Sequence, residues 1–99
     1  MSGTGENRLP SEKALKHLAN LAIDHDKPIM MDYWTDSFAD ADASVLIGVR
    51  ENDEKLLVRS EEEYTSPITK IFRVAEEYIV ITENSIYVVS ATIPTKRIS

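Results

Sequence analysis

Apolar residues first recur with a helical period, in residues 11–25. They fall three and four positions apart, which places them on one face of an α-helix; they are Ala14, Leu15, Leu18, Leu21, Ala22 and Ile23. Ser11 suits the N-cap, because its hydroxyl can accept a hydrogen bond from a free backbone N–H of the first turn. Pro28 disfavours helical backbone at the residue before it. The sequence therefore predicts an amphipathic helix from Ser11 to His25.

After Pro28 the pattern changes to alternating or continuous apolar runs, which are typical of β-strands. We predict strands at residues 28–34, 44–50, 55–60, 68–74, 78–82 and 85–90. The short connections at 51–54 and 83–85 predict two antiparallel hairpins. In the second hairpin, Asn84 is the residue that best tolerates a positive φ.

This order of elements predicts an α+β fold, with the N-terminal amphipathic helix packed on a five- to six-stranded antiparallel meander or a small barrel. We expect residues 1–9 to be a flexible arm, residues 10–93 a single domain and residues 94–99 a peripheral tail. The strands at 78–82 and 85–90 carry apolar residues at consecutive positions, so both of their faces need cover. We expect the helix on one face and a partner subunit on the other.

Composition narrows the classes of function. The chain has 99 residues, no cysteine and a net charge of −6. Thiolate metal sites, disulfides and a cysteine nucleophile are thereby excluded. An acidic chain with scattered Lys and Arg is a poor match for nucleic acid or for an anionic membrane. The first ten residues lack the apolar core of a signal peptide, and no apolar run is long enough to span a membrane. These features predict an intracellular, cytoplasmic protein.

The segment "DSFADADAS" contains the acidic residues Asp36, Asp40 and Asp42. Hard cations such as Ca²⁺ prefer several oxygen ligands, and in an extended segment Asp40 and Asp42 share one side. A regular EF-hand is excluded, because the segment has no central glycine and no closing glutamate. Two interpretations stay open: a weak divalent-cation site formed by these three aspartates, and a solvated acidic loop.

Aromatic and arginine residues suggest a second kind of site. Tyr33 and Trp34 could hold a cationic group, and Arg50 and Arg59 could meet an anionic one. A groove that combines these four residues would bind a small ligand. The alternative is that the two rings fill the core, and exposure of Trp34 would favour the binding interpretation.

Motifs for catalysis are missing from the sequence. No G-x-S-x-G elbow occurs, and two of the three glycines lie in the expected arm, so a glycine-rich phosphate loop cannot form. Gly48 lies inside a strand, where a bulge or a close approach by the helix would explain it. The acidic pairs, such as Glu76 and Glu77, fall in expected turns, where solvent surrounds them. We predict no enzyme and no cofactor; Asp32 and His17 are the best remaining candidates for chemistry.

Two classes of function remain. The first is a non-catalytic interaction or structural accessory protein, of the kind that viruses also encode, which assembles with itself or with a larger partner protein. The second is a small ligand-binding module that uses the aromatic and arginine residues. A stable monomer would favour the second class, and a discrete multimer the first.

Overall fold

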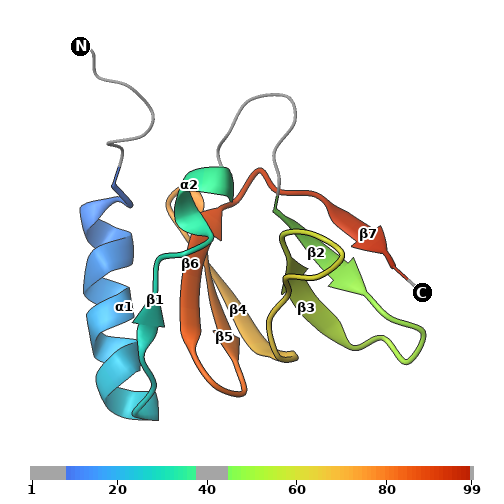
Figure 1. The fold of residues 1–99 in the computed structure, drawn as a ribbon. Coiled ribbons are helices and arrows are strands. Elements are labelled where there is room, and N and C mark those ends of the chain that lie inside the picture. Colours follow the sequence, from blue (N-terminus) through green and yellow to red (C-terminus); the bar gives the residue numbers. More distant parts are fainter. Residues whose placement is uncertain (1–8, 38–44, 99) are drawn as a thin grey trace.

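The computed structural model describes residues 9–37 and 45–98, which form three layers: a long helix, a four-stranded sheet and a three-stranded sheet (Figure 1). The elements in chain order are α1 (Glu12–His25), β1 (Ile29–Met30), α2 (Trp34–Ser37), β2 (Leu46–Val49), β3 (Lys55–Val58), β4 (Ile68–Val74), β5 (Glu77–Thr82), β6 (Ile86–Ser90) and β7 (Thr95–Arg97). The predicted α+β class is confirmed.

Both ends of α1 have the caps that its sequence favours. The Ser11 hydroxyl accepts a hydrogen bond from the Ala14 N–H at 3.2 Å. At the other end Asp26 adopts a left-handed conformation (φ 55°), and its N–H donates to the Ala22 carbonyl. The predicted helix is confirmed within one residue. Its buried face is narrower than predicted, because Ile23 is 78% exposed.

The two sheets are mixed rather than purely antiparallel, and they do not close into a barrel. The first has strand order β1-β6-β5-β4 and the second β3-β2-β7. The pairs β2–β3, β4–β5 and β5–β6 are antiparallel, whereas β1 runs parallel to β6 and β7 runs parallel to β2. The predicted antiparallel meander is therefore right for the two hairpins and wrong for the edges that flank β6 and β2.

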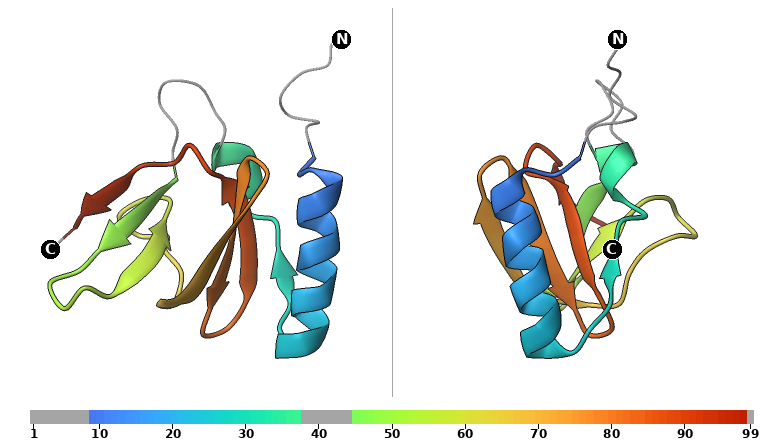
Figure 2. Two further views of the ribbon diagram at one scale, coloured as in Figure 1. Left: turned by 180° about the vertical axis from the view of Figure 1, so that it is seen from behind. Right: turned by 90° about the vertical axis from the view of Figure 1, so that its left-hand side faces the viewer.

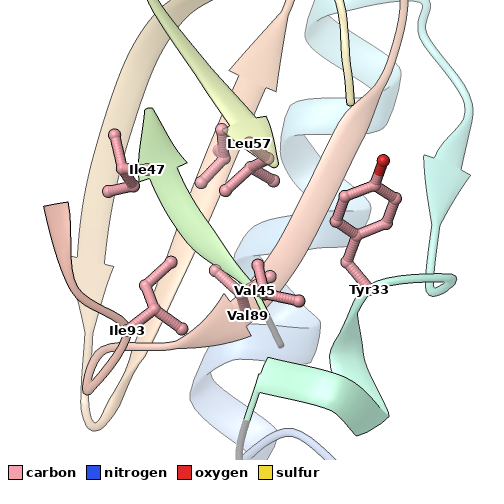
Figure 3. Close-up of a cluster of buried hydrophobic side chains, with 7 residues drawn as sticks. Tyr33, Val45, Ile47, Leu57, Val89 and Ile93 are labelled. Carbon is pink, nitrogen blue, oxygen red and sulfur yellow. The ribbon is translucent and has the colours of Figure 1, made fainter. Parts of the chain in front are cut away.

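Strands β5 and β6 form the centre of the molecule, with apolar side chains on both faces. The helix-side face contributes to one cluster: Leu18, Trp34, Ile79, Ile81, Ile86 and Val88. The opposite face contributes to a second cluster, which β2 and β3 complete (Figure 3): Tyr33, Val45, Ile47, Leu57, Val80, Val89 and Ile93. Each fully buried aliphatic side chain of this kind contributes about 1.5–3 kcal/mol. The second face, which we assigned to a partner subunit, is thus covered by the chain's own second sheet.

The predicted strand at 28–34 is wrong beyond Met30. Tyr33 and Trp34 are buried in different clusters, on opposite sides of the four-stranded sheet. The chain turns into α2 at this point. Ser37 in α2 then donates its hydroxyl to the Trp34 carbonyl at 2.6 Å and accepts the Ser90 N–H at 2.8 Å. Ser37 therefore provides an acceptor for the Ser90 N–H, in the part of β6 that β1 is too short to reach.

The hairpin turns obtain their geometry in different ways. Asp53, in the predicted β2–β3 turn, has φ 66°. Asn84, the residue of the second turn that best tolerates a positive φ, does not adopt one; the Thr82 hydroxyl accepts hydrogen bonds from the N–H groups of Asn84 and Ser85. In the β4–β5 turn Ala75 has φ 54°, a left-handed conformation that is energetically unfavourable for residues other than glycine.

Two further segments differ from expectation. Residues 95–97 of the expected tail form β7, whose residue Lys96 lies opposite Gly48 of β2. Gly48 does mark a close approach, but by side chains other than those of the helix. A Cβ atom there would lie 2.7 Å from Ile98 Cδ1 and 2.9 Å from Val58 Cγ2. Glu77, expected in a solvated turn, is buried in β5 and accepts a hydrogen bond from the Ser11 hydroxyl at 2.7 Å.

Candidate functional site

Arg59, directly after β3, brings together two of the residues singled out in the sequence. Its Nε donates to Asp36 Oδ2 at 2.9 Å, and its guanidinium lies 5.4 Å from the centre of the Tyr33 ring. Tyr33 also makes an edge-to-face contact with Tyr87, with ring centres 5.3 Å apart. About a third of each charged side chain is exposed (32% and 35%), so water screens the ion pair. The cluster joins α2 to β3, which is a structural role.

The environment of this cluster raises the pKa values of its two tyrosines. Burial raises the pKa of the Tyr33 phenol above its ordinary value, Tyr87 and Glu63 raise that pKa further, and Arg59 lowers it. Burial also raises the pKa of Tyr87, and Asp32 adds to that shift. These shifts act only at alkaline pH, because a phenol of ordinary pKa is already protonated at neutral pH.

Only one of the three aspartates of the predicted cation site lies within the described residues. Asp40 and Asp42 lie outside the described residues, and the Asp36 carboxylate is bound by Arg59. Within residues 9–37 and 45–98, no group of three or more metal-ligating side chains converges.

Trp34 lies in the helix-side core and is only 3% exposed. Its ring is therefore not available to surround a ligand, and the condition that would have favoured an aromatic cage is not met. Of the four residues of the predicted ligand groove, Tyr33 and Arg59 lie together. Trp34 and Arg50 lie elsewhere.

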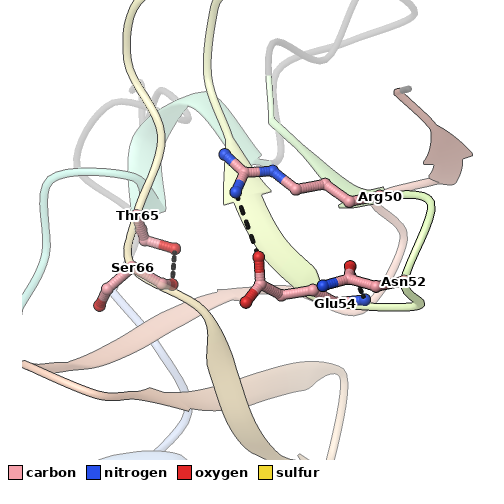
Figure 4. A network of polar contacts seen from close by, with 5 residues as sticks. All are labelled: Arg50, Asn52, Glu54, Thr65 and Ser66. Carbon is pink, nitrogen blue, oxygen red and sulfur yellow. Dashed lines mark hydrogen bonds and ion pairs between the residues drawn. The ribbon is translucent and has the colours of Figure 1, made fainter.

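Arg50 lines a separate groove of about 360 Å³ beside β3. Its guanidinium pairs with Glu54 at 3.1 Å (Figure 4) and lies 5.7 Å from the centre of the Tyr64 ring. The lining residues are Arg50, Leu56, Val58, Ser60, Glu61, Tyr64 and Ile98. This groove combines an arginine with the ring of Tyr64 rather than with Tyr33 or Trp34, and Glu54 already pairs with that arginine.

A larger groove, of about 450 Å³, lies between α1 and β4, and we call it the helix–edge groove. Figure 2 (right view) shows α1 crossing the four-stranded sheet with β4 beside it. The lining residues are Lys13, His17, Leu21, Phe72, Arg73, Val74, Ala75 and Ile79. Sequence reasoning missed this site. The available signal was the spacing of Lys13, His17 and Leu21, which recur every fourth residue on one helix face.

The helix–edge groove combines an apolar floor with cations. The Phe72 ring is partly exposed, at 37%. Lys70 Nζ lies 5.8 Å from the centre of that ring, and Arg73 Nε donates to the Ala75 carbonyl at 3.3 Å. None of the eight lining residues is acidic, although the chain carries a net charge of −6. The groove therefore differs in charge from the protein as a whole.

The two residues considered for catalysis do not meet. His17 lines the helix–edge groove beside β4, whereas Asp32 is exposed just after β1. Strands β1 and β4 form opposite edges of the four-stranded sheet. An acid–base pair requires groups within hydrogen-bonding reach of one substrate, and these two residues are not so placed.

Comparisons of the chain with known protein families, with characterised proteins and with solved structures found no match. In the part of the chain that the structure describes, no helix is long and apolar enough to cross a membrane.

Proposed function

We propose that this protein is a non-catalytic interaction protein that binds an acidic partner protein in the helix–edge groove. The observation that carries the proposal is the contrast between the groove and the rest of the chain. Phe72 offers apolar surface there, Lys13 in the lining and Lys70 beside the Phe72 ring supply positive charge, and no lining residue is acidic. Complementary charge steers a partner to a surface and rejects like-charged ones.

A different protein is favoured over a second copy of this chain. The apolar face of β5 and β6 that would have required self-assembly is buried by the chain's own second sheet. Homo-oligomerisation, which the sequence suggested, is therefore a competing outcome that light scattering on the purified chain tests directly.

Binding of a small anionic ligand in the Arg50 groove is the second candidate. It is supported by the contact between Arg50 and Tyr64, which places a cation and an aromatic ring at one opening. Glu54 and Glu61 weaken this candidate, because an anion would have to displace the first and approach the second. The helix–edge groove has no such obstacle.

A photo-crosslinking amino acid at position 72 tests the proposal in the cells that make the protein. We expect one discrete acidic partner to crosslink from position 72 and not from Asn52, an exposed residue of the β2–β3 turn. The identified partner is then purified and titrated against the double variant Lys13→Glu/Lys70→Glu. We expect affinity to fall about tenfold, because attractive contacts become repulsive ones.

Lys16→Glu/Lys96→Glu is the matched control, since it makes the same change of charge at exposed positions outside the groove. Equal losses in both double variants would mean that only net charge matters, and would contradict a site in the groove.

A further inference from the structure

We infer that the partner contributes an extended segment that pairs with β4 as an added strand of the four-stranded sheet. This inference rests on the proposed function and concerns how the same groove is filled. It comes from comparing the sheet edges of the described residues. Strands β1 and β7, at two of these edges, have only two and three residues.

The edge at β3 is occupied by the chain itself. The Thr65 N–H donates to the Leu57 carbonyl at 2.9 Å, and the Leu57 N–H donates to the Thr65 hydroxyl at 3.1 Å. The Arg59 N–H donates to the Glu63 carbonyl at 2.9 Å. The segment at 63–65 therefore pairs with Leu57 of β3 and with Arg59 just after it, and covers this part of the edge.

The edge at β4 is different. This strand has seven residues, the longest in the described parts of the chain, and pairs only with β5. Alternate residues of an antiparallel strand direct their N–H and C=O groups away from the existing partner, so an edge strand presents a row of unpaired groups. The one irregularity in its pairing lies at Ile68/Lys70, near the start, and leaves the part beside the groove regular.

The register of β4 aligns this open edge with the groove. Lys70, Phe72 and Val74 lie opposite Ile81, Ile79 and Glu77 of β5, respectively. Ile79 and Ile81 belong to the helix-side cluster, and residues opposite each other share a face. An added strand would therefore place every second side chain over the helix-side face, where Phe72 lines the groove. Backbone pairing would supply affinity and the groove would supply specificity.

Charge identifies the class of segment. Lys70 lies beside the exposed Phe72 ring and Lys13 lines the same groove, so the groove face favours an apolar side chain with acidic residues two positions before and after it. The same charges oppose pairing of β4 with β4 of a second copy, because Lys70 and Arg73 would then approach like charges. The occupant is therefore an acidic extended segment of another protein.

The test uses the full chain and a synthetic nine-residue peptide, DTETFTETD, acetylated and amidated at its ends. Its odd positions place acidic residues on both sides of one phenylalanine. The control DTEFTTETD has the same composition, with the phenylalanine moved to the other face. A third peptide, KTKTFTKTK, reverses the charge. Binding is measured by calorimetry and by amide NMR shifts of residues 68–75.

We expect saturable binding of the first peptide, binding weaker by about tenfold for the control with the shifted ring, and none for the lysine peptide. N-methylation at the fourth and sixth residues is then compared with N-methylation at the fifth and seventh. Only one of the two pairs directs its N–H groups at β4, so one variant should lose about tenfold in affinity while the other changes little.

The outcomes separate this inference from the proposed function. If the first peptide binds and both methylated variants lose affinity equally, strand addition is overturned, while an acidic partner in the groove stands. If neither the peptide nor the crosslinked partner binds in a manner sensitive to Lys13→Glu/Lys70→Glu, both are overturned. Saturable binding of the lysine peptide with shifts at residues 68–75 would overturn the charge argument.

Discussion

Ser37 offers the sharpest test of how this fold is held together, because one hydroxyl satisfies two backbone groups. It is fully buried, donates to the Trp34 carbonyl at 2.6 Å and accepts the Ser90 N–H at 2.8 Å. Ser37→Ala removes the hydroxyl with little change in volume. The Ser90 N–H would then be buried without an acceptor.

The expected loss follows from that orphaned donor. A buried polar group without a partner costs about 1–3 kcal/mol, and the better helix propensity of alanine returns about 0.5 kcal/mol. We expect Ser37→Ala to lower the free energy of unfolding by about 0.5–2.5 kcal/mol. For a domain of this size that corresponds to a fall in Tm of about 2–20 °C.

Urea unfolding measures this change through two signals: far-UV circular dichroism and the fluorescence of Trp34, the only tryptophan. Ser60→Ala is the matched control. The Ser60 hydroxyl also accepts backbone N–H groups, from Glu62 and Glu63, but these bonds are exposed. Water can replace them, so we expect a loss below about 0.5 kcal/mol. Equal losses for the two variants would refute the argument that burial sets the cost.

Three further predictions follow from local geometry. Ala75→Gly should raise stability by about 0.5–1 kcal/mol, because relief of the left-handed conformation outweighs the added freedom of the unfolded chain; unchanged thermal unfolding would contradict this. Gly48→Ala should destabilise the protein by about 1–2 kcal/mol, because the added methyl group clashes with Ile98. The loss should be smaller in an Ile98→Ala background. A double-mutant cycle that shows no coupling between the two positions would count against the placement of β7. Because burial raises the pKa of Tyr33 above its unfolded value of 10.0, its contribution to stability is complete below that pH and is lost as pH rises through the folded pKa. Tyr33→Phe should reduce the decline in urea midpoint between about pH 9 and pH 11, and an identical decline in both proteins would show that this phenol is not responsible.

The elements predicted correctly are those with strong local signals. The helix from Glu12 to His25 has a cap, a periodic apolar face and a following proline. Strand β4 was predicted with its observed bounds, and both hairpins were found from short polar connections between apolar runs. Each of these signals acts over a few residues, so it can be read without knowing the rest of the fold.

The incorrect predictions concern segments whose structure is set by contacts with residues far away in the sequence. The stretch from Met31 to Trp34 alternates like a strand, yet α2 forms because the Tyr33 and Trp34 rings enter clusters on opposite sides of the sheet. Residues 95–97 have no marked strand pattern; they become β7 because β2 has an edge that accepts them. Asn84 needs no positive φ because the Thr82 hydroxyl satisfies the turn.

The candidate site divides in the same way. The sequence by itself determined the α+β class, the acidic net charge and the lack of catalytic motifs. Only the tertiary structure decided that Trp34 is core, that Asp36 is bound by Arg59, and that α1 leaves Phe72 exposed beside an open strand edge. The physical reason is that period and composition specify which residues need burial, whereas the packing of whole layers decides which apolar surface and which backbone edge remain uncovered.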